Sequence, residues 1–130
     1  ERPQVKVFSK KTTQAVKSML HSVTQPGGTG RKARIADFHV GGKTGTTMKS
    51  VSGSYASRSY WASFVGIAPI NNPRFVMAVV IDDPQDDVYY GGAVAAPLFS
   101  KVMERVHHIY GKSPDNLITN KMKISDANES

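Results

Sequence analysis

The stretch Gly-Gly-Lys-Thr-Gly-Thr-Thr at residues 41–47 decides the fold prediction for this chain. A strand alternates its side chains between two faces, so Lys43 is predicted on one face and Thr44 and Thr46 on the other. Gly45 has no side chain and lets a second backbone approach the strand closely. At a sheet edge, a peptide could pair with the free N–H and C=O groups of this strand. Threonine hydroxyls can donate to a carboxylate, and a lysine favours an anion or helps to activate a hydroxyl nucleophile. The stretch therefore predicts recognition of an extended anionic peptide.

Two further strands are predicted after this one. Loose alternation extends the first strand over residues 38–48, and apolar runs indicate strands over 60–68 and 74–81. Segment 50–58, rich in Ser, Gly and Tyr, reads as a hairpin connection, and Asn-Asn-Pro at 71–73 is a tight turn. The third strand is apolar on both faces, and we expect it to be central and covered on both sides.

A helix is predicted before the strands. Ser9 is a suitable N-cap because its hydroxyl can accept a hydrogen bond from the first turn. Apolar residues then follow at helical spacing and predict one buried stripe: Val16, Met19, Leu20 and Val23. Pro-Gly-Gly at residues 26–28 ends this helix.

A second helix is predicted after the strands. It opens at the glycine pair 91–92, and Gly111 is a natural C-cap. Pro97 fits this helix only in its first turn. One apolar stripe runs along it: Val94, Leu98, Val102, Val106 and Ile109. The order predicts an α+β fold of a helix, three antiparallel strands and a helix, with both helices on the same face of the sheet.

Composition narrows the function classes. The 130 residues are 39% hydrophobic and 21% charged, with a net charge of +7 and no cysteine. Disulfides, thiolate metal sites and cysteine nucleophiles are therefore excluded. A basic balance indicates an anionic partner such as nucleic acid, lipid headgroups or a carboxylate-rich substrate, or else a solvated surface. The histidines lack metal spacing and the aspartates at 82–87 lack the glycine of a calcium loop, so no metal or cofactor is predicted. The longest apolar run, 75–81, is too short to cross a membrane, and we expect any anchor outside this chain.

The Lys-Thr-Gly triplet at 43–45 carries a family resemblance. With Ser-x-x-Lys and Ser-Asp-Asn it forms the signature set of penicillin-binding proteins and class A β-lactamases. Four more segments add to the likeness, at residues 27–30, 60–69, 79–84 and 89–97, of which Tyr-Gly-Gly-Ala-Val-Ala-Ala-Pro in the last is the most specific. The chain resembles the C-terminal part of the transpeptidase domain of septal class B penicillin-binding proteins of Gram-negative bacteria over roughly residues 5–117.

This resemblance implies a fold and a function. Residues 1–112 would be the C-terminal portion of a penicillin-binding protein or β-lactamase-like transpeptidase domain, and 113–130 a loose tail. The whole enzyme would be a serine-type D,D-transpeptidase that cross-links peptidoglycan stem peptides at the septum and is acylated by β-lactams. Its implied partners are stem peptides, β-lactams, division-site membrane proteins and the upstream part of the same enzyme, and not nucleic acid. It would lie on the periplasmic side of the inner membrane, held by a single-pass anchor outside this chain.

The resemblance also implies roles for individual residues. Lys43 would belong to the polar network around the serine, and the hydroxyls of Thr44 and Thr46 would bind the terminal carboxylate of the substrate. The backbone N–H of Thr46 would be one of two oxyanion donors, and Gly45 would lie in the same binding strand. Three tyrosines match positions that form an aromatic wall beside the ligand, although each could simply pack: Tyr60, Tyr89 and Tyr90.

One part of the family pattern is missing. No Ser-x-x-Lys or Ser-x-Asn occurs anywhere in the chain. The Thr-x-x-Lys spacings at 29–32 and 46–49 fall in a loop and in the binding strand, and neither is suited to a nucleophile. Met48 stands where many relatives carry a basic or small residue. The chain is therefore expected to hold one wall of an active site and to be inactive alone.

Two rival classes remain open at the level of sequence. A nucleic-acid-binding module is favoured only by the charge, because no zinc pattern, recognition helix or RNP-like strand is present. Steep salt dependence of DNA binding would support it. A non-catalytic interaction domain is the other, and a cleft that contains residues 43–46 would disfavour it.

Overall fold

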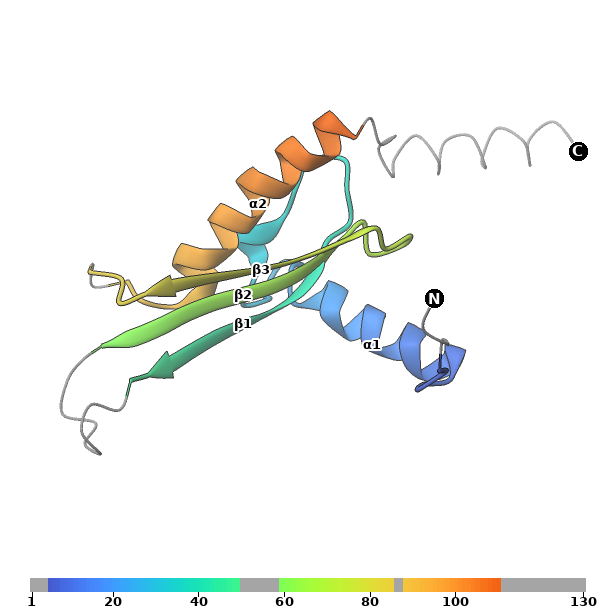
Figure 1. Ribbon diagram of the computed structural model, residues 1–130, viewed down its shortest axis with the longest axis horizontal. Helices are drawn as coiled ribbons and strands as arrows, with labels where there is room; N and C mark the ends of the chain where they lie inside the picture. Colours follow the sequence, from blue (N-terminus) through green and yellow to red (C-terminus); the bar gives the residue numbers. More distant parts are fainter. Residues whose placement is uncertain (1–4, 50–58, 86–87, 111–130) are drawn as a thin grey trace, which may run out of the picture.

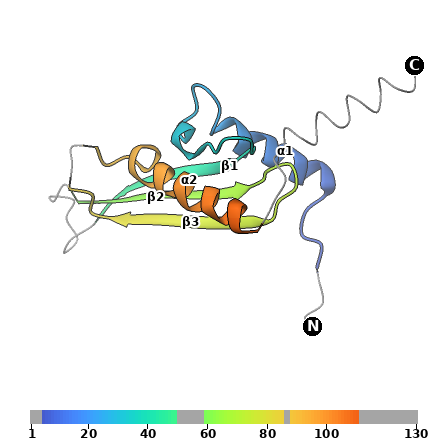
Figure 2. The same ribbon diagram turned by 90° about the horizontal axis from the view of Figure 1, so that it is seen from above.

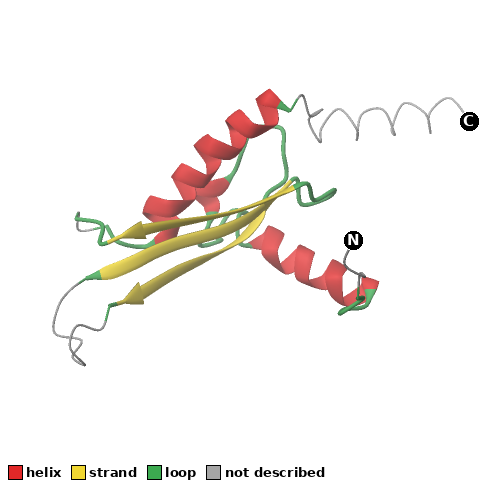
Figure 3. Cartoon of the chain, in the orientation of Figure 1, coloured by secondary structure: helices red, strands yellow, loops and turns green. Residues whose placement is uncertain are grey.

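The computed structural model describes residues 5–49, 59–85 and 88–110. Its elements follow the predicted order, with a helix at each end and the strands between (Figure 3). Their bounds are α1 Lys10–Ser22, the short 3₁₀ helix η1 Arg31–Ala33, β1 Gly41–Met48, β2 Tyr60–Ala68, β3 Phe75–Asp82 and α2 Gly91–Ile109. The 50–58 connection, Gly111 and the 113–130 tail, all subjects of prediction, lie outside the described residues.

The three strands form one antiparallel sheet in the order β1-β2-β3 (Figure 1). Thr44 pairs with Phe64, which pairs with Val79 on the next strand. The antiparallel prediction is confirmed. The prediction that the third strand is central is wrong within the described sheet, because β2 lies in the middle and β3 at an edge.

Helix α2 covers one face of the sheet, running diagonally across it (Figure 2). Alternate residues of β2 point toward α2 and are buried, and the rings of Phe64 and Phe99 meet edge to face at 5.0 Å between centroids. Gly66 lies beneath the same ring, where a Cβ would collide with Phe99. Burial of one such aromatic side chain stabilises the fold by about 1.5–3 kcal/mol. The core of the chain therefore lies between β2 and α2.

The opposite face of the sheet, which we call the back face, is apolar and largely exposed. Trp61, Val65, Val76 and Val80 alternate with the buried residues of β2 and β3, and their exposed fractions are 43%, 46%, 71% and 56%. Lys43 pairs with Val65 and shares this face. No element in the described part of the chain covers these side chains along their length. A contiguous apolar surface of this kind is typical of an interface.

Helix α1 does not lie beside α2. Its N-terminus is capped as predicted, with the Ser9 hydroxyl accepting a hydrogen bond from the Thr12 N–H at 3.1 Å. Its main contact is with β1, where the Leu20 backbone would lie 3.2 Å from a Cβ on Gly41, a position on the back face. The two helices lie on opposite sides of the sheet (Figure 1), so the same-face prediction is wrong.

The predicted buried stripe of α1 is also wrong for its first half. Val16 and Met19 are exposed by 47% and 66%, whereas Leu20 and Val23 are half-buried. The reason is geometric, because α1 meets the sheet only at its C-terminal end and then runs away from it (Figure 1). A stripe shows that a helix has an apolar side, but it does not show that this chain provides the cover.

Two local features differ from the prediction, namely the start of β1 and the position of Pro97 in α2. Strand β1 begins at Gly41 rather than at residue 38, because Asp37 adopts a φ of 65° in a turn bridged by Ile35 and Phe38. Pro97 lies inside α2, past its first turn, where its missing N–H removes the usual donor to the Ala93 carbonyl.

In the described ranges, no helix is long and apolar enough to cross a membrane, and no cluster of side chains could hold a metal ion.

Candidate functional site

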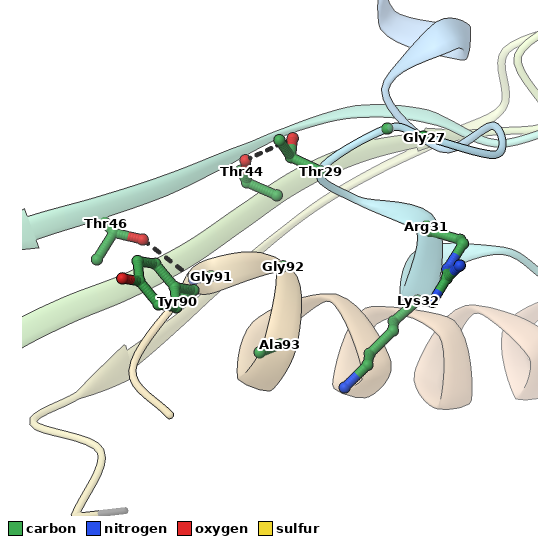
Figure 4. Close-up of a pocket in the computed structure, with 11 residues that line it drawn as sticks. Gly27, Thr29, Arg31, Lys32, Thr44, Thr46, Tyr90, Gly91, Gly92 and Ala93 are labelled. Atoms are coloured by element: carbon green, nitrogen blue, oxygen red, sulfur yellow. Dashed lines mark hydrogen bonds between the residues drawn. The ribbon is translucent and has the colours of Figure 1, made fainter. Parts of the chain in front are cut away.

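A cavity of about 450 Å³ lies where β1 meets the first turn of α2 and the loop that leads into η1 (Figure 4). Thr44, Thr46 and Tyr90, three of the predicted site residues, line it. The remaining lining residues come from the glycine-rich loop with η1 and from the start of α2: Gly27, Gly28, Thr29, Arg31, Lys32, Gly91, Gly92 and Ala93. The cavity therefore joins three segments that are distant in sequence.

The glycine pair allows α2 to start directly on the sheet. A Cβ on Gly91 would overlap the backbone oxygens of Ser63 and Gly45, and a Cβ on Gly92 would overlap the Thr29 carbonyl oxygen. The N-cap residue, Tyr90, makes no capping hydrogen bond with its side chain. The Gly91 N–H instead donates to the Thr46 hydroxyl oxygen at 3.2 Å. The positive end of the helix dipole is thereby placed beside the threonines.

Three threonine hydroxyls gather in the cavity. Thr44 and Thr46 point to the α2 face, as strand alternation predicts, and Thr29 lies 3.0 Å from Thr44 between hydroxyl oxygens. Because the Thr46 oxygen accepts from Gly91, its own proton remains available to donate into the cavity. Thr29 belongs to the segment 27–30 that adds to the family resemblance, but its sequence context, a threonine between glycines, assigns no role to its hydroxyl. Donors arranged in this way suit a carboxylate.

Lys43 does not line this cavity. Its side chain is exposed on the back face, and its Nζ donates to the Thr44 carbonyl at 2.8 Å. Thr44 and Thr46 thus line the cavity while Lys43 lies on the other face of the strand, as the predicted alternation requires. Gly45 also faces the back, where a Cβ would overlap the Ser63 hydroxyl. The structure therefore requires a glycine at position 45 so that the Ser63 side chain on the neighbouring strand has room to pack.

The three predicted wall tyrosines form one stack. The ring centroids of Tyr60 and Tyr89 are 4.1 Å apart, and those of Tyr89 and Tyr90 are 4.5 Å apart. A hydrogen bond to Tyr89, at 3.3 Å between hydroxyl oxygens, raises the pKa of Tyr90 above its ordinary 10.0. Tyr90 is 57% exposed and borders the cavity, whereas the other two rings are not among its lining residues. The stack thus stands at one end of the cavity.

A polar cluster at the end of β3 supports the start of β2. The Ser59 hydroxyl donates to the Asp83 carboxylate at 2.7 Å, and the Asp83 N–H donates to the Tyr60 carbonyl at 2.8 Å. Asp83 adopts a φ of 50°, and the bond from Ser59 lowers the pKa of its carboxyl. Gln85 also donates to this carboxylate. These bonds fix the backbone beneath the first ring of the tyrosine stack.

Comparison with known proteins assigns the chain to a class. The family model described as penicillin binding protein transpeptidase domain matches residues 1–104. The chain belongs to this family, as its Lys-Thr-Gly strand and flanking segments predict.

Individual relatives narrow the class. The chain is 46% identical over 118 residues to the "Probable peptidoglycan D,D-transpeptidase PenA" of Neisseria gonorrhoeae, covering 90% of this chain and 20% of that protein. It is 42% identical over 118 residues to "Peptidoglycan D,D-transpeptidase FtsI" of Escherichia coli K12, with the same shares covered. It superimposes on the apo transpeptidase domain of Burkholderia pseudomallei penicillin-binding protein 3 with a TM-score of 0.77 and 40% identity, covering 85% of this chain and 34% of that one. The chain thus spans about one fifth of the length of these curated relatives.

Proposed function

We propose that this chain is the C-terminal part of a serine-type peptidoglycan D,D-transpeptidase that cross-links stem peptides in septal wall synthesis and is acylated by β-lactams. The observation that carries the proposal is the cavity in which Thr44 and Thr46, from the family's Lys-Thr-Gly strand, present hydroxyls beside the positive end of α2. The sequence relationship to proteins named PenA and FtsI adds support.

Each side of β1 would serve a different step. The Thr44 and Thr46 hydroxyls would donate to the terminal carboxylate of the stem peptide, with Thr29 orienting Thr44 through their 3.0 Å contact. The Thr46 backbone N–H would stabilise the oxyanion that forms when a serine attacks the penultimate carbonyl. Since β1 has a neighbour on only one side in the described sheet, its other edge is available to the peptide backbone.

Lys43 would act on the opposite face. It would join the polar network that takes the proton from the attacking serine. For this role the lysine needs the serine hydroxyl within reach. No Ser-x-x-Lys motif occurs in this sequence, so that serine must come from another segment. The exposed back face, where Lys43 lies beside Val65, is where we place the upstream part of the same enzyme. Burial of the apolar side chains there would stabilise the assembly.

The cellular setting follows from the same assignment. Relatives of this chain carry the names of cell-wall synthesis enzymes. We place the intact enzyme on the periplasmic side of the inner membrane, held by an anchor outside this chain and in contact with division-site membrane proteins.

Acylation of the intact enzyme tests the proposal. Wild-type enzyme should form a stoichiometric adduct with labelled benzylpenicillin, and Thr46→Pro, which removes one backbone donor, should cost about 3 kcal/mol in the acylation transition state. Lys43→Ala should cripple the same step. Mass spectrometry of the 130-residue chain alone should find no adduct. Acylation by folded Thr46→Pro within twofold of wild type would remove the oxyanion assignment, and an adduct on the lone chain would show that the chemistry sits here.

A further inference from the structure

The charged side chains that line the cavity are both positive. Among its eleven lining residues the charged ones are Arg31 and Lys32, both cationic. The hydrogen bond between the hydroxyls of Tyr90 and Tyr89 raises the pKa of Tyr90, so this phenol adds no negative charge near neutral pH. In the described ranges, the ion pair that the structure shows is Lys49 with Asp82, and none involves Arg31 or Lys32. Among the residues that the structure describes, the charge lining the cavity is therefore that of these two cations.

The backbone that carries the two cations is held by a fixed turn. Residues Arg31–Ala33 form η1, closed by the Ala33 N–H on the Gly30 carbonyl at 2.9 Å. Ala33 is fully buried against α2, and the Ser100 hydroxyl donates to the Arg34 carbonyl at 2.7 Å. Figure 4 shows Arg31 and Lys32 at one side of the site and Tyr90 with Thr46 at the other. The turn thus fixes the backbone positions of Arg31 and Lys32 at the edge of the cavity, although both side chains extend into solvent.

We propose that Arg31 and Lys32 are specificity determinants of this cavity, which draw carboxylate-bearing ligands toward the threonine hydroxyls and leave the binding of neutral ligands unchanged. This inference rests on the proposed function. Because both side chains are exposed, they act through their field rather than through a buried ion pair. One unit charge acting on another across about 8 Å of water changes an association constant roughly two- to threefold. The Debye length falls from about 8 Å at physiological salt to about 3 Å at 1 M, so the effect must fade with salt.

A charge-matched experiment on the intact enzyme tests this inference. The second-order rate of acylation is measured for benzylpenicillin, an anion, and for its neutral methyl ester, at low salt and at 1 M NaCl. Arg31→Gln and Lys32→Gln should each lower the rate for the anion about two- to threefold at low salt, and the double variant about fivefold. The rates for the ester, and those for the anion at 1 M NaCl, should stay within twofold of wild type.

Control variants separate local charge from net charge and from loop shape. Lys10→Gln and Arg74→Gln remove exposed cations from α1 and the β2–β3 turn, and should leave the ratio of anion to ester rates unchanged. Arg31→Lys should retain the wild-type ratio. Equal losses for anion and ester, losses that persist at 1 M NaCl, or equal effects of the controls would each overturn the inference. Failure of wild-type enzyme to be acylated by benzylpenicillin would instead remove the proposed function on which it rests.

Discussion

Substitution of Gly91 by alanine isolates the contact that joins α2 to the threonine strand. The φ of Gly91 is not in the left-handed region, so alanine can adopt its backbone conformation. The added Cβ, however, would overlap the backbone oxygens of Ser63 and Gly45. Backbone atoms in the middle of a sheet cannot turn aside as a flexible side chain can. The start of α2 must therefore move off the sheet and take the Gly91 N–H away from Thr46.

The size of the effect follows from these two consequences. Overpacking by one methyl group costs about 1–3 kcal/mol. Loss of one neutral hydrogen bond costs about 0.5–1.5 kcal/mol. Together they predict a loss of about 1.5–4.5 kcal/mol, which lowers the Tm of a domain of 150–250 residues by roughly 3–18 °C. A Thr46 hydroxyl that is no longer oriented should slow acylation about fivefold, the equivalent of roughly 1 kcal/mol.

Gly27 provides a matched comparison, because its requirement for glycine has the opposite cause. Its φ is 84°, and nothing lies within 4 Å of an added Cβ. Gly27→Asn should be tolerated, since asparagine accepts this conformation more readily than other residues, whereas Gly91→Asn should be as harmful as Gly91→Ala. Thermal denaturation and penicillin acylation of the intact variants measure both effects. A Gly91→Ala enzyme with a Tm within 1 °C and an acylation rate within twofold of wild type would refute the reasoning.

Three further predictions concern the neighbours of this contact. Thr29→Val should weaken capture of benzylpenicillin about fivefold while Thr29→Ser retains it, because the hydroxyl contact with Thr44 is worth about 1 kcal/mol; equal capture by the valine and serine variants would contradict this. Tyr89→Ala and Tyr90→Ala should each weaken β-lactam capture by roughly 0.5–1.5 kcal/mol without unfolding the protein, and a large fall in Tm with unchanged acylation would favour packing alone. Asp83 has a lowered pKa in the folded state, so its contribution to stability is present above its unfolded value near 3.8 and is lost as pH falls through the folded value. Wild type should thus lose stability relative to Asp83→Asn as urea denaturation is carried into that acid range, and parallel curves for the two proteins would refute it.

The features that sequence predicts well here are local ones. The Ser9 cap, the placement of Thr44 and Thr46 on one face of β1, and the three strands all follow from spacing within a few residues. The family resemblance also groups Tyr60, Tyr89 and Tyr90, which form one stack in the structure.

Features that depend on distant contacts were harder to predict. Apolar stripes on two helices do not specify which face of the sheet each one takes, and α1 lies opposite α2. The Thr29 contact with Thr44 joins residues from different segments and has no periodic pattern. The position of Pro97 inside α2 shows that neighbouring turns can hold a helix through a missing donor.

The partial attachment of α1 has a thermodynamic consequence. Its outer half leaves Val16 and Met19 exposed. Its inner end is joined to the loop that holds Thr29 by the hydrogen bond from the Gly30 N–H to the Val23 carbonyl, at 2.9 Å. If a group that packs on the exposed half shifted α1, this bond would pass the shift to the loop and change the free energy of the Thr29–Thr44 contact. By linkage, a ligand that depends on that contact would then change the affinity of the group for α1 by the same factor. In that case, the affinity measured at the outer surface of the helix would depend on whether the cavity is occupied, and the affinity of the cavity would depend on what is bound to the helix.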